Sequence, residues 1–439
     1  MANLLSQAEE FAQQGDWSNL AQCLQQFIST EPEQEFTHGE QDKVLSLAMQ
    51  VLQSGDFQDC WEVAKVFPRF GQAAVPPLIG LLREEDAELE ARWFAARILG
   101  ELAEPTAIQA LVDVLQTADD DDLSGIAAEA LANLGTSAIA ALASLLPQPE
   151  SRLSVVQALA QIRHPDIIAP LLTVVDDAQP TIRALAIEAL SSFHDPQIPP
   201  VLVAALQDPI ATVRRAAITG LAVRSDLAIE LNLEALLADR LWDLHLGVCQ
   251  QAAAALGRLG TDAAVNGLVR ALNGTNAPLA LQLEIIRALA WAGTDIALER
   301  LQATLTTPPP CESPERLYQE IFTVLGRWAT AEYQPLVAQM LVDFLNSNHL
   351  VLESAQIKIA IALALGQLKQ LIGLEPLVQL LATEDAGVRL HVIAALRQLA
   401  PQTTQQRLAE LYTSQTTSEQ LRQGLKIALQ EWQVELPHY

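Results

Sequence analysis

Hydrophobic residues recur along the chain with the spacing of an amphipathic helix. In DPIATVRRAAITGLA, residues 208–222, Ala217 and Leu221 follow Arg214 by three and seven positions, so all three share one side of a helix. The same frame is present at five other arginines, namely Arg92, Arg152, Arg183, Arg389 and Arg422. We therefore predict a helix with one buried face at each of these six places.

Weaker copies of the frame, with another residue in the arginine position, lie between the strong ones. These reference positions are Ser124, Cys249, Gln282, Tyr318 and Lys358, and they bring the spacing between successive copies to 28–40 residues. A period near 30 residues is typical of a helical-hairpin repeat. The pattern predicts an all-α, right-handed α-solenoid of about ten to eleven helical hairpins.

The residues before each reference position complete the repeat. A second amphipathic segment precedes it, as in AAVPPLIGLL and DIIAPLLTVV, with prolines in the first helical turn. An aspartate lies six residues before the arginine at Asp86, Asp177 and Asp208, in the turn between the two helices. We interpret these residues as a structural ladder that caps helix ends and ties neighbouring units together; its members are Asp86, Arg92, Asp177, Arg183, Asp208, Arg214 and Arg389.

The ends of the chain depart from the repeat. Residues 1–59 predict an N-terminal helical cap, residues 60–400 the repeat array, and residues 401–439 a more polar C-terminal capping repeat. At 225–245 the spacing stretches to 35 residues. We expect a kink in the array there.

Composition limits the classes of function. The 439 residues carry 53 Asp and Glu against 26 Lys and Arg, a formal charge of −27. Such a chain repels phosphate backbones, so we expect no nucleic-acid role. No apolar run reaches the roughly 18 residues that a membrane helix needs. Four widely separated cysteines form no CxxC pair, and a cytoplasmic protein fits this pattern.

The order of acidic turn, Val-Arg, small residues and Leu-Gly, as in DPIATVRRAAITGLA and EARWFAARILGELAEPTAIQALVDVL, resembles HEAT-like repeats. More narrowly, it resembles the short repeats of the phycobilin lyase family of organisms with phycobilisomes. The resemblance spans roughly residues 60–432. It implies a stacked helical array, and for that family a linear tetrapyrrole attached to cysteines of a phycobiliprotein. The recurrent residues are those that build any solenoid, so they imply a fold and leave the activity open.

Several chemical motifs are absent or have structural explanations. No His-Glu pair is present, which sets aside the HEAT-like di-iron hydroxylases, and neither a Gly-x-Gly-x-x-Gly nor a Walker motif occurs. The run Asp119–Asp122 lacks the ligand spacing of a calcium loop and predicts a helix cap, so we expect no metal site. We interpret His245 as a packing residue and expect Cys311, in a proline-rich turn, to be exposed. No residue stands out as catalytic.

Positions one and five after the reference residue should face the concave side, which the second helices line in solenoids of this type. They supply the candidate groove residues Trp93, Arg97, Glu188 and Arg215. An aromatic ring beside two arginines and a carboxylate could hold a protein partner or a planar ligand with carboxylates. Two functions follow. One is an interaction scaffold, with a phycobiliprotein among its expected partners. The other is a bilin lyase or chromophore chaperone, with a bilin as a transient ligand and no other cofactor.

Overall fold

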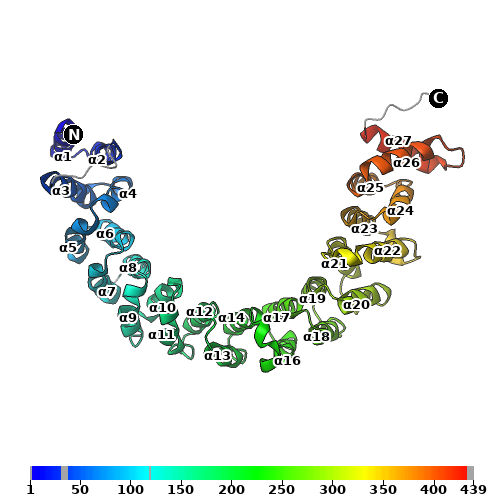
Figure 1. Ribbon diagram of the computed structural model, residues 1–439, viewed down its shortest axis with the longest axis horizontal. Helices are drawn as coiled ribbons and strands as arrows, with labels where there is room; N and C mark the ends of the chain where they lie inside the picture. The colour runs from blue at the N-terminus through cyan, green and yellow to red at the C-terminus, as the bar shows by residue number, and fades with distance from the viewer. Residues whose placement is uncertain (1, 31–37, 118–119, 433–439) are drawn as a thin grey trace. The chain divides into compact units, whose positions relative to one another are not determined.

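The computed structural model describes residues 2–30, 38–117 and 120–432. These residues form 27 α-helices and nine short 3-10 helices, with no strand among them (Figure 1). The all-α prediction is confirmed. The chain divides into two compact units, Met1–Ala217 and Ile218–Tyr439, and the division falls within one helix, α14.

Four helices precede the repeats of the first unit. They are α1 (Ala2–Gln14), α2 (Trp17–Thr30), α3 (His38–Ser54) and α4 (Phe57–Ala64). The α4 helix begins with a capping box, in which the Asp56 carboxylate accepts from the Asp59 backbone N–H and the Asp59 carboxylate accepts from that of Asp56. The predicted boundary at residue 59 falls within α4, and the division into cap, array and capping repeat stays a prediction.

Helical hairpins follow, each with a first and a second helix. The first helices of the first unit are α5 (Val75–Arg83), α7 (Ile108–Thr117), α9 (Thr136–Leu145), α11 (Ile168–Leu172) and α13 (Ile198–Ala205). The second helices are α6 (Leu89–Leu102), α8 (Asp121–Asn133), α10 (Arg152–Gln161), α12 (Pro180–Leu190) and α14 (Ala211–Ala222). Prolines lie in the first turns of α5 and α13, where no intrahelical hydrogen bond is lost.

The second unit continues the same pattern. Its first helices are α16 (Leu233–Asp239), which the short α15 (Ala228–Leu231) precedes, α18 (Asp262–Leu272), α20 (Asp295–Thr306), α22 (Gln334–Leu345), α24 (Leu374–Leu380) and α26 (Pro401–Thr413). Its second helices are α17 (Leu246–Leu259), α19 (Leu279–Ala292), α21 (Pro314–Gly326), α23 (Ala355–Leu368), α25 (Ala386–Leu399) and α27 (Glu419–Glu431). Asn232 adopts the left-handed conformation between α15 and α16. The kink at 225–245 stays a prediction.

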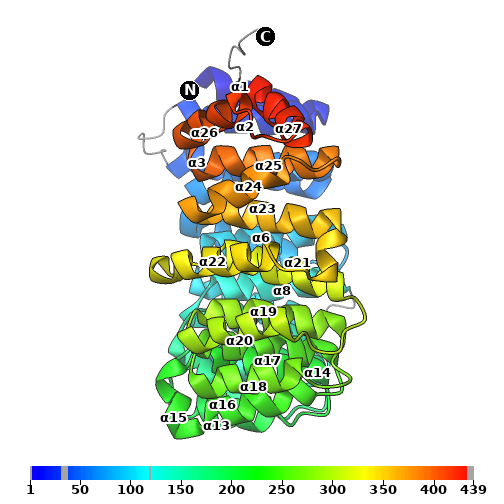
Figure 2. The same cartoon turned by 90° about the vertical axis from the view of Figure 1, so that its right-hand side faces the viewer.

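The predicted frame marks the start of each second helix. The reference residue is the fourth residue of the helix in nine of the eleven hairpins. Within each unit the second helices form the inner row and the first helices the outer row (Figure 1). In the second unit α19, α21, α23 and α25 run side by side (Figure 2). The residues three and seven after Arg214, Ala217 and Leu221, are fully buried, as the helical period requires.

The glycine of the Leu-Gly motif allows neighbouring second helices to approach closely. A Cβ added at Gly100 would lie 2.6 Å from the Ala130 Cα, where α6 meets α8. Gly326 approaches Ala364 in the same way, at 2.6 Å. Each glycine lies eight residues after the reference position of its hairpin, and each alanine lies six residues after the reference position of the next hairpin. The motif is therefore a packing device between repeats.

Candidate functional site

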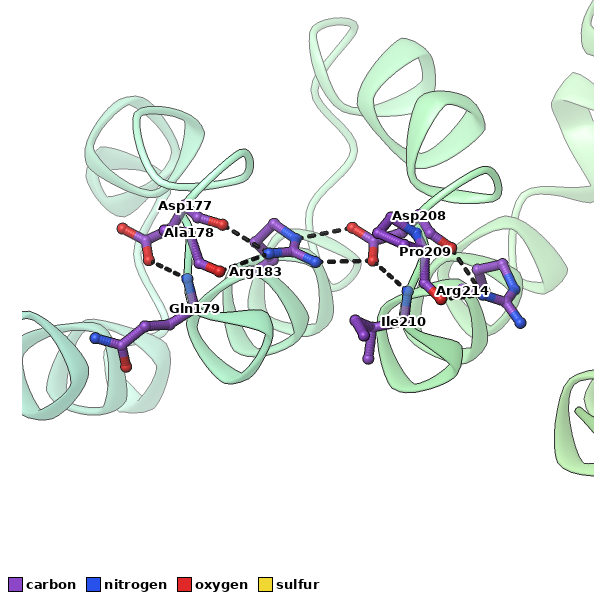
Figure 3. Close-up of polar contacts among 8 residues, drawn as sticks. All are labelled: Asp177, Ala178, Gln179, Arg183, Asp208, Pro209, Ile210 and Arg214. Atoms are coloured by element: carbon purple, nitrogen blue, oxygen red, sulfur yellow. Dashed lines mark hydrogen bonds and ion pairs between the residues drawn. The ribbon is translucent and has the colours of Figure 1, made fainter.

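The ladder residues of the first unit connect successive inter-helix turns (Figure 3). The Arg183 guanidinium donates to both carboxylate oxygens of Asp208, from Nε at 2.8 Å and from Nη2 at 2.9 Å. Its Nη1 donates to the Asp177 carbonyl at 2.7 Å, in its own turn. Asp208 also accepts from the Ile210 backbone N–H at 2.8 Å. One arginine thus holds two consecutive turns, a bidentate geometry that favours arginine over lysine.

The Arg183–Asp208 ion pair is largely shielded from water, with side-chain exposures of 10% and 11%. Burial alone would raise the pKa of Asp208, but the hydrogen bonds from Arg183 and from the backbone of Ile210 outweigh it and lower the pKa below its ordinary value. The hydrogen bonds to Asp208 raise the pKa of Arg183 in turn. The pair stays charged at neutral pH and joins two consecutive inter-helix turns.

Other rungs vary in their partners. Arg152 donates to the Asp177 carboxylate at 2.7 Å and to the Leu146 carbonyl at 2.6 Å, an additional rung that the sequence ladder did not include. Arg214 donates to the Asp208 carbonyl at 2.7 Å. Arg389 donates to the Thr383 carbonyl in its own turn at 2.9 Å, and Arg92 donates to the Leu82 carbonyl at the end of α5 at 3.1 Å.

The ladder differs from the prediction at Asp86. Its carboxylate is exposed, and the guanidinium of Arg92 reaches the end of α5 instead of the aspartate in the turn. Arg92 therefore ties the two helices of one hairpin together, while Asp86 contributes no bond to it.

In two hairpins of the second unit, a tyrosine and a glutamine occupy the arginine position and make equivalent bonds. The His349 Nδ1 accepts from the Val351 N–H at 3.2 Å, so its Nε2 carries the proton and donates to the Tyr318 hydroxyl at 3.0 Å. That hydroxyl donates to the Leu305 carbonyl at 3.2 Å. Gln282 likewise donates to the Pro310 carbonyl at 2.8 Å in the next turn. These joints link successive turns without charge.

Two of the predicted groove residues lie together on the inner row of the first unit. The Arg97 guanidinium carbon is 4.0 Å from the Trp61 ring centroid and 5.9 Å from that of Trp93. Phe57 stacks on Trp61 with a centroid separation of 6.4 Å. We call Phe57, Trp61, Trp93 and Arg97 the aromatic cluster. Phe57 and Trp61 are 51% and 37% exposed, so the cluster presents apolar surface to solvent.

Sequence reasoning missed two members of the aromatic cluster. Phe57 and Trp61 lie on α4, before the first reference position, so the repeating frame did not include them. Their spacing of four residues on an amphipathic segment was the available signal.

Glu188 borders a separate hollow of about 810 Å³ between α10 and α12. Its lining combines charged, amide and apolar side chains, and the lining residues are Gln157, Ala160, Gln161, Ile162, Arg163, Leu185, Glu188, Ala189, Ser192 and Phe193. Arg215 lies on α14 with an exposed side chain and is not among the residues that line this hollow. The structure thus brings Trp93 and Arg97 together and gives Glu188 a different setting, with no contact between the two sets.

The other residues weighed from the sequence have local roles. Asp119 lies outside the described residues, while Asp120 caps α8 by accepting from the Leu123 N–H at 2.9 Å. His245 caps α17 through its Nδ1, which accepts from the Gly247 N–H at 3.2 Å. Cys311 is partly exposed, in contrast to the buried Cys60, whose pKa burial raises to about 12.

Comparison with known families explains the repeat. A family model for HEAT repeats matches residues 45–132 and 138–222, and the model for the PBS lyase HEAT-like repeat matches residues 248–274. The chain therefore contains HEAT repeats in these segments. The first matched segment of this HEAT-repeat protein begins inside α3, upstream of the first reference position. The resemblance to PBS lyase repeats is confirmed for one repeat, residues 248–274.

Solved structures show the same fold at low sequence identity. Importin beta in an ammonium sulfate condition and yeast importin-beta (Kap95p) each match with a TM-score of 0.53 and 13% identity, over 97% of this chain and 64% of theirs. Kap95p bound to RanGDP matches with a TM-score of 0.50 and 13% identity, over 94% of this chain and 57% of that chain. The HEAT-repeat protein therefore spans less than two thirds of these solenoids. No curated protein sequence matches it significantly.

Among the described residues, no three or more His, Cys, Asp or Glu side chains are grouped so that they could hold a metal ion. The helices in this part of the chain also lack the length and apolar character of a membrane-spanning segment.

Proposed function

We propose that this HEAT-repeat protein is a scaffold that holds a protein partner on the inner row of second helices in its first unit. The observation that carries the proposal is the aromatic cluster, in which partly exposed rings surround a guanidinium. Clustered Trp and Arg side chains supply much of the binding energy in protein interfaces. HEAT solenoids of the same fold bind proteins, as Kap95p binds RanGDP.

The charge distribution supports a partner that carries carboxylates. The chain has a formal charge of −27, so most of its surface repels acidic groups. Arg97 places positive charge among the aromatic rings, although Glu101 accepts from it at 3.1 Å. A partner carboxylate that displaces Glu101 would find both a cation and an apolar surface there. Acidic surroundings would disfavour other orientations.

The test is capture from native extract followed by reconstitution with the purified partner. The double variant Trp61→Ser, Arg97→Glu should bind at least tenfold more weakly than the wild type, about 1.4 kcal/mol or more. Ile210→Ser, which alters an apolar side chain with a similar exposure of 39%, is the matched control and should bind normally. Unchanged affinity in the folded double variant would contradict this site. The charge-reversal pair Arg97→Glu, Arg215→Glu tests whether the surface extends to α14.

The match to a PBS lyase HEAT-like repeat favours a second candidate, in which the inner row holds a linear tetrapyrrole for transfer to cysteines of a phycobiliprotein. Trp93 would contact the tetrapyrrole plane and Arg97 its carboxylates, while Glu188 and Arg215, which lie further along the inner row on α12 and α14, would contact the phycobiliprotein. Under either candidate, phycobilisome proteins are the expected partners and the cytoplasm the expected location. Titration with a free bilin separates the candidates. If the bilin changes its visible absorbance with the wild type and not with Arg97→Glu, the tetrapyrrole function is supported. If its spectrum does not change with the wild type, the scaffold function is favoured.

A further inference from the structure

The second unit contains a hollow of about 400 Å³ between the C-terminal ends of α19 and α21. It is bordered by Trp291, Arg287, Glu320, Arg327 and Trp328. All of these residues belong to two neighbouring second helices or to the segment directly after α21. We call it the Trp291 hollow.

Trp291 gives the Trp291 hollow an exposed aromatic face. Its side chain is 70% exposed, an unusual exposure for the largest apolar residue. The Arg258 guanidinium carbon lies 5.6 Å from its ring centroid. This cation–π contact favours one orientation of the indole before any ligand arrives, which lowers the entropic cost of binding.

The charged side chains that line the Trp291 hollow leave positive charge available. Arg287 is engaged by Glu320, at 2.7 and 3.1 Å, and by Glu284, at 3.2 Å. Arg327 is exposed and, among the described residues, its guanidinium makes no hydrogen bond or ion pair. The side chain of a basic residue at a helix C-terminus commonly binds the last carbonyl groups. Here the backbone N–H of Arg327 binds the Val324 carbonyl, and its guanidinium binds none of the described carbonyl groups. Its charge is therefore open to a ligand carboxylate.

Trp328 supplies an unsatisfied donor. The residue is 3% exposed, and its indole Nε1 is buried without an acceptor in the described structure. A buried donor without a partner costs about 1–3 kcal/mol. A ligand that brings an oxygen acceptor to this indole would recover part of that cost.

We infer that the Trp291 hollow binds an acidic segment of a protein partner. A side-chain carboxylate pairs with Arg327, a neighbouring apolar side chain packs on Trp291, and a backbone carbonyl accepts from the Trp328 indole after a small local adjustment. Consecutive residues of one peptide supply all three groups. The net negative charge of the chain confines acidic peptides to such local positive sites.

The inference rests on the proposed scaffold function but not on the aromatic cluster, because the two surfaces share no residue. The variants that test them are therefore independent. Loss of binding in the Trp61→Ser, Arg97→Glu protein tests the cluster in the first unit. The Trp291 hollow is tested by substitutions in the second unit alone.

The experiment is an NMR titration of the full chain with ¹⁵N-labelled tryptophan, whose seven indole N–H groups give a small set of signals. The Trp291→Phe and Trp328→Phe variants assign two of them. The probe is the peptide acetyl-Asp-Phe-Asp-Leu-amide, and the same peptide with lysine in place of aspartate is the control probe. We expect the acidic peptide to shift the Trp291 signal and to move the Trp328 signal downfield.

Arg327→Glu should weaken the acidic peptide at least tenfold, while Arg300→Glu, the same charge reversal at an exposed residue of α20, should leave its affinity unchanged. Three results would overturn the inference: no shift of either signal at millimolar peptide, equal shifts with the lysine peptide, or equal affinity in Arg327→Glu. If Trp328→Phe does not fold, the Trp291 signal and the two arginine variants still decide the outcome.

Discussion

Replacing Gly100 with alanine adds a methyl group at the closest approach of α6 and α8. The new Cβ would lie 2.6 Å from the Ala130 Cα and 2.8 Å from its Cβ, whereas carbon atoms pack at about 3.5–4.0 Å. The helices must separate by roughly 1 Å, an overpacking cost of about 1–3 kcal/mol. The higher helix propensity of alanine offsets about 1 kcal/mol of it. We expect a net loss of stability of up to about 2 kcal/mol.

Gly125 provides the matched control, because it lies within α8 and no atom would come within 4 Å of its added Cβ. Gly125→Ala should stabilise the protein by about 0.4–1 kcal/mol. Urea unfolding of both variants, followed by circular dichroism, gives a difference of about 1–3 kcal/mol that isolates the clash. If Gly100→Ala is as stable as Gly125→Ala, the packing role assigned to the Leu-Gly motif is wrong.

Three further predictions concern the ladder, its uncharged counterpart and the cysteines. The pKa of Asp208 is lowered in the folded state, so its pairing with Arg183 stabilises the protein above the ordinary aspartate pKa of about 3.9, and this stabilisation is lost as the pH falls through the lower folded value. Asp208→Asn should therefore reduce the pH dependence of the free energy of unfolding, measured in urea between about pH 2 and 5. The same pH dependence in the variant and the wild type would argue against the ladder. Tyr318→Phe should lower the free energy of unfolding by about 1–3 kcal/mol, because two hydrogen bonds to its buried hydroxyl are lost, and wild-type stability in that variant would count against the joint. Iodoacetamide at neutral pH should modify Cys311 in the folded protein and spare Cys60, whose pKa is about 12; mass spectrometry that finds Cys60 alkylated first would refute the assignment.

Most of the repeat could be predicted from the sequence because its period is local. A helix face follows from positions three and seven after the reference residue, and the fully buried Ala217 and Leu221 confirm it. The chemistry of the joints could not be predicted in the same way. Tyr318 occupies the position of the arginine in other hairpins, and its role follows only from its contact with His349 of the next hairpin.

The candidate site was harder to predict because the spacing of residues within one helix says little about the distances between residues of different hairpins. Trp93 and Arg97 are four residues apart and lie together, as one helical turn requires. Glu188 and Arg215 come from other hairpins of the same unit, and no periodicity fixes how close their long side chains come to Arg97. Trp61 completes the aromatic cluster from α4, which lies before the first reference position of the predicted frame.

The central claim is that a protein partner binds the inner row of the first unit, and site-specific photocrosslinking tests it most directly. A photoreactive benzoylphenylalanine replaces Trp61 on α4 or Gln157 on the second helix α10, or the exposed Ser144 and Ala169 on the first helices α9 and α11. After irradiation of each variant with its captured partner, crosslinks should form from Trp61 or Gln157 and not from Ser144 or Ala169. Crosslinks from the first helices alone would contradict the account.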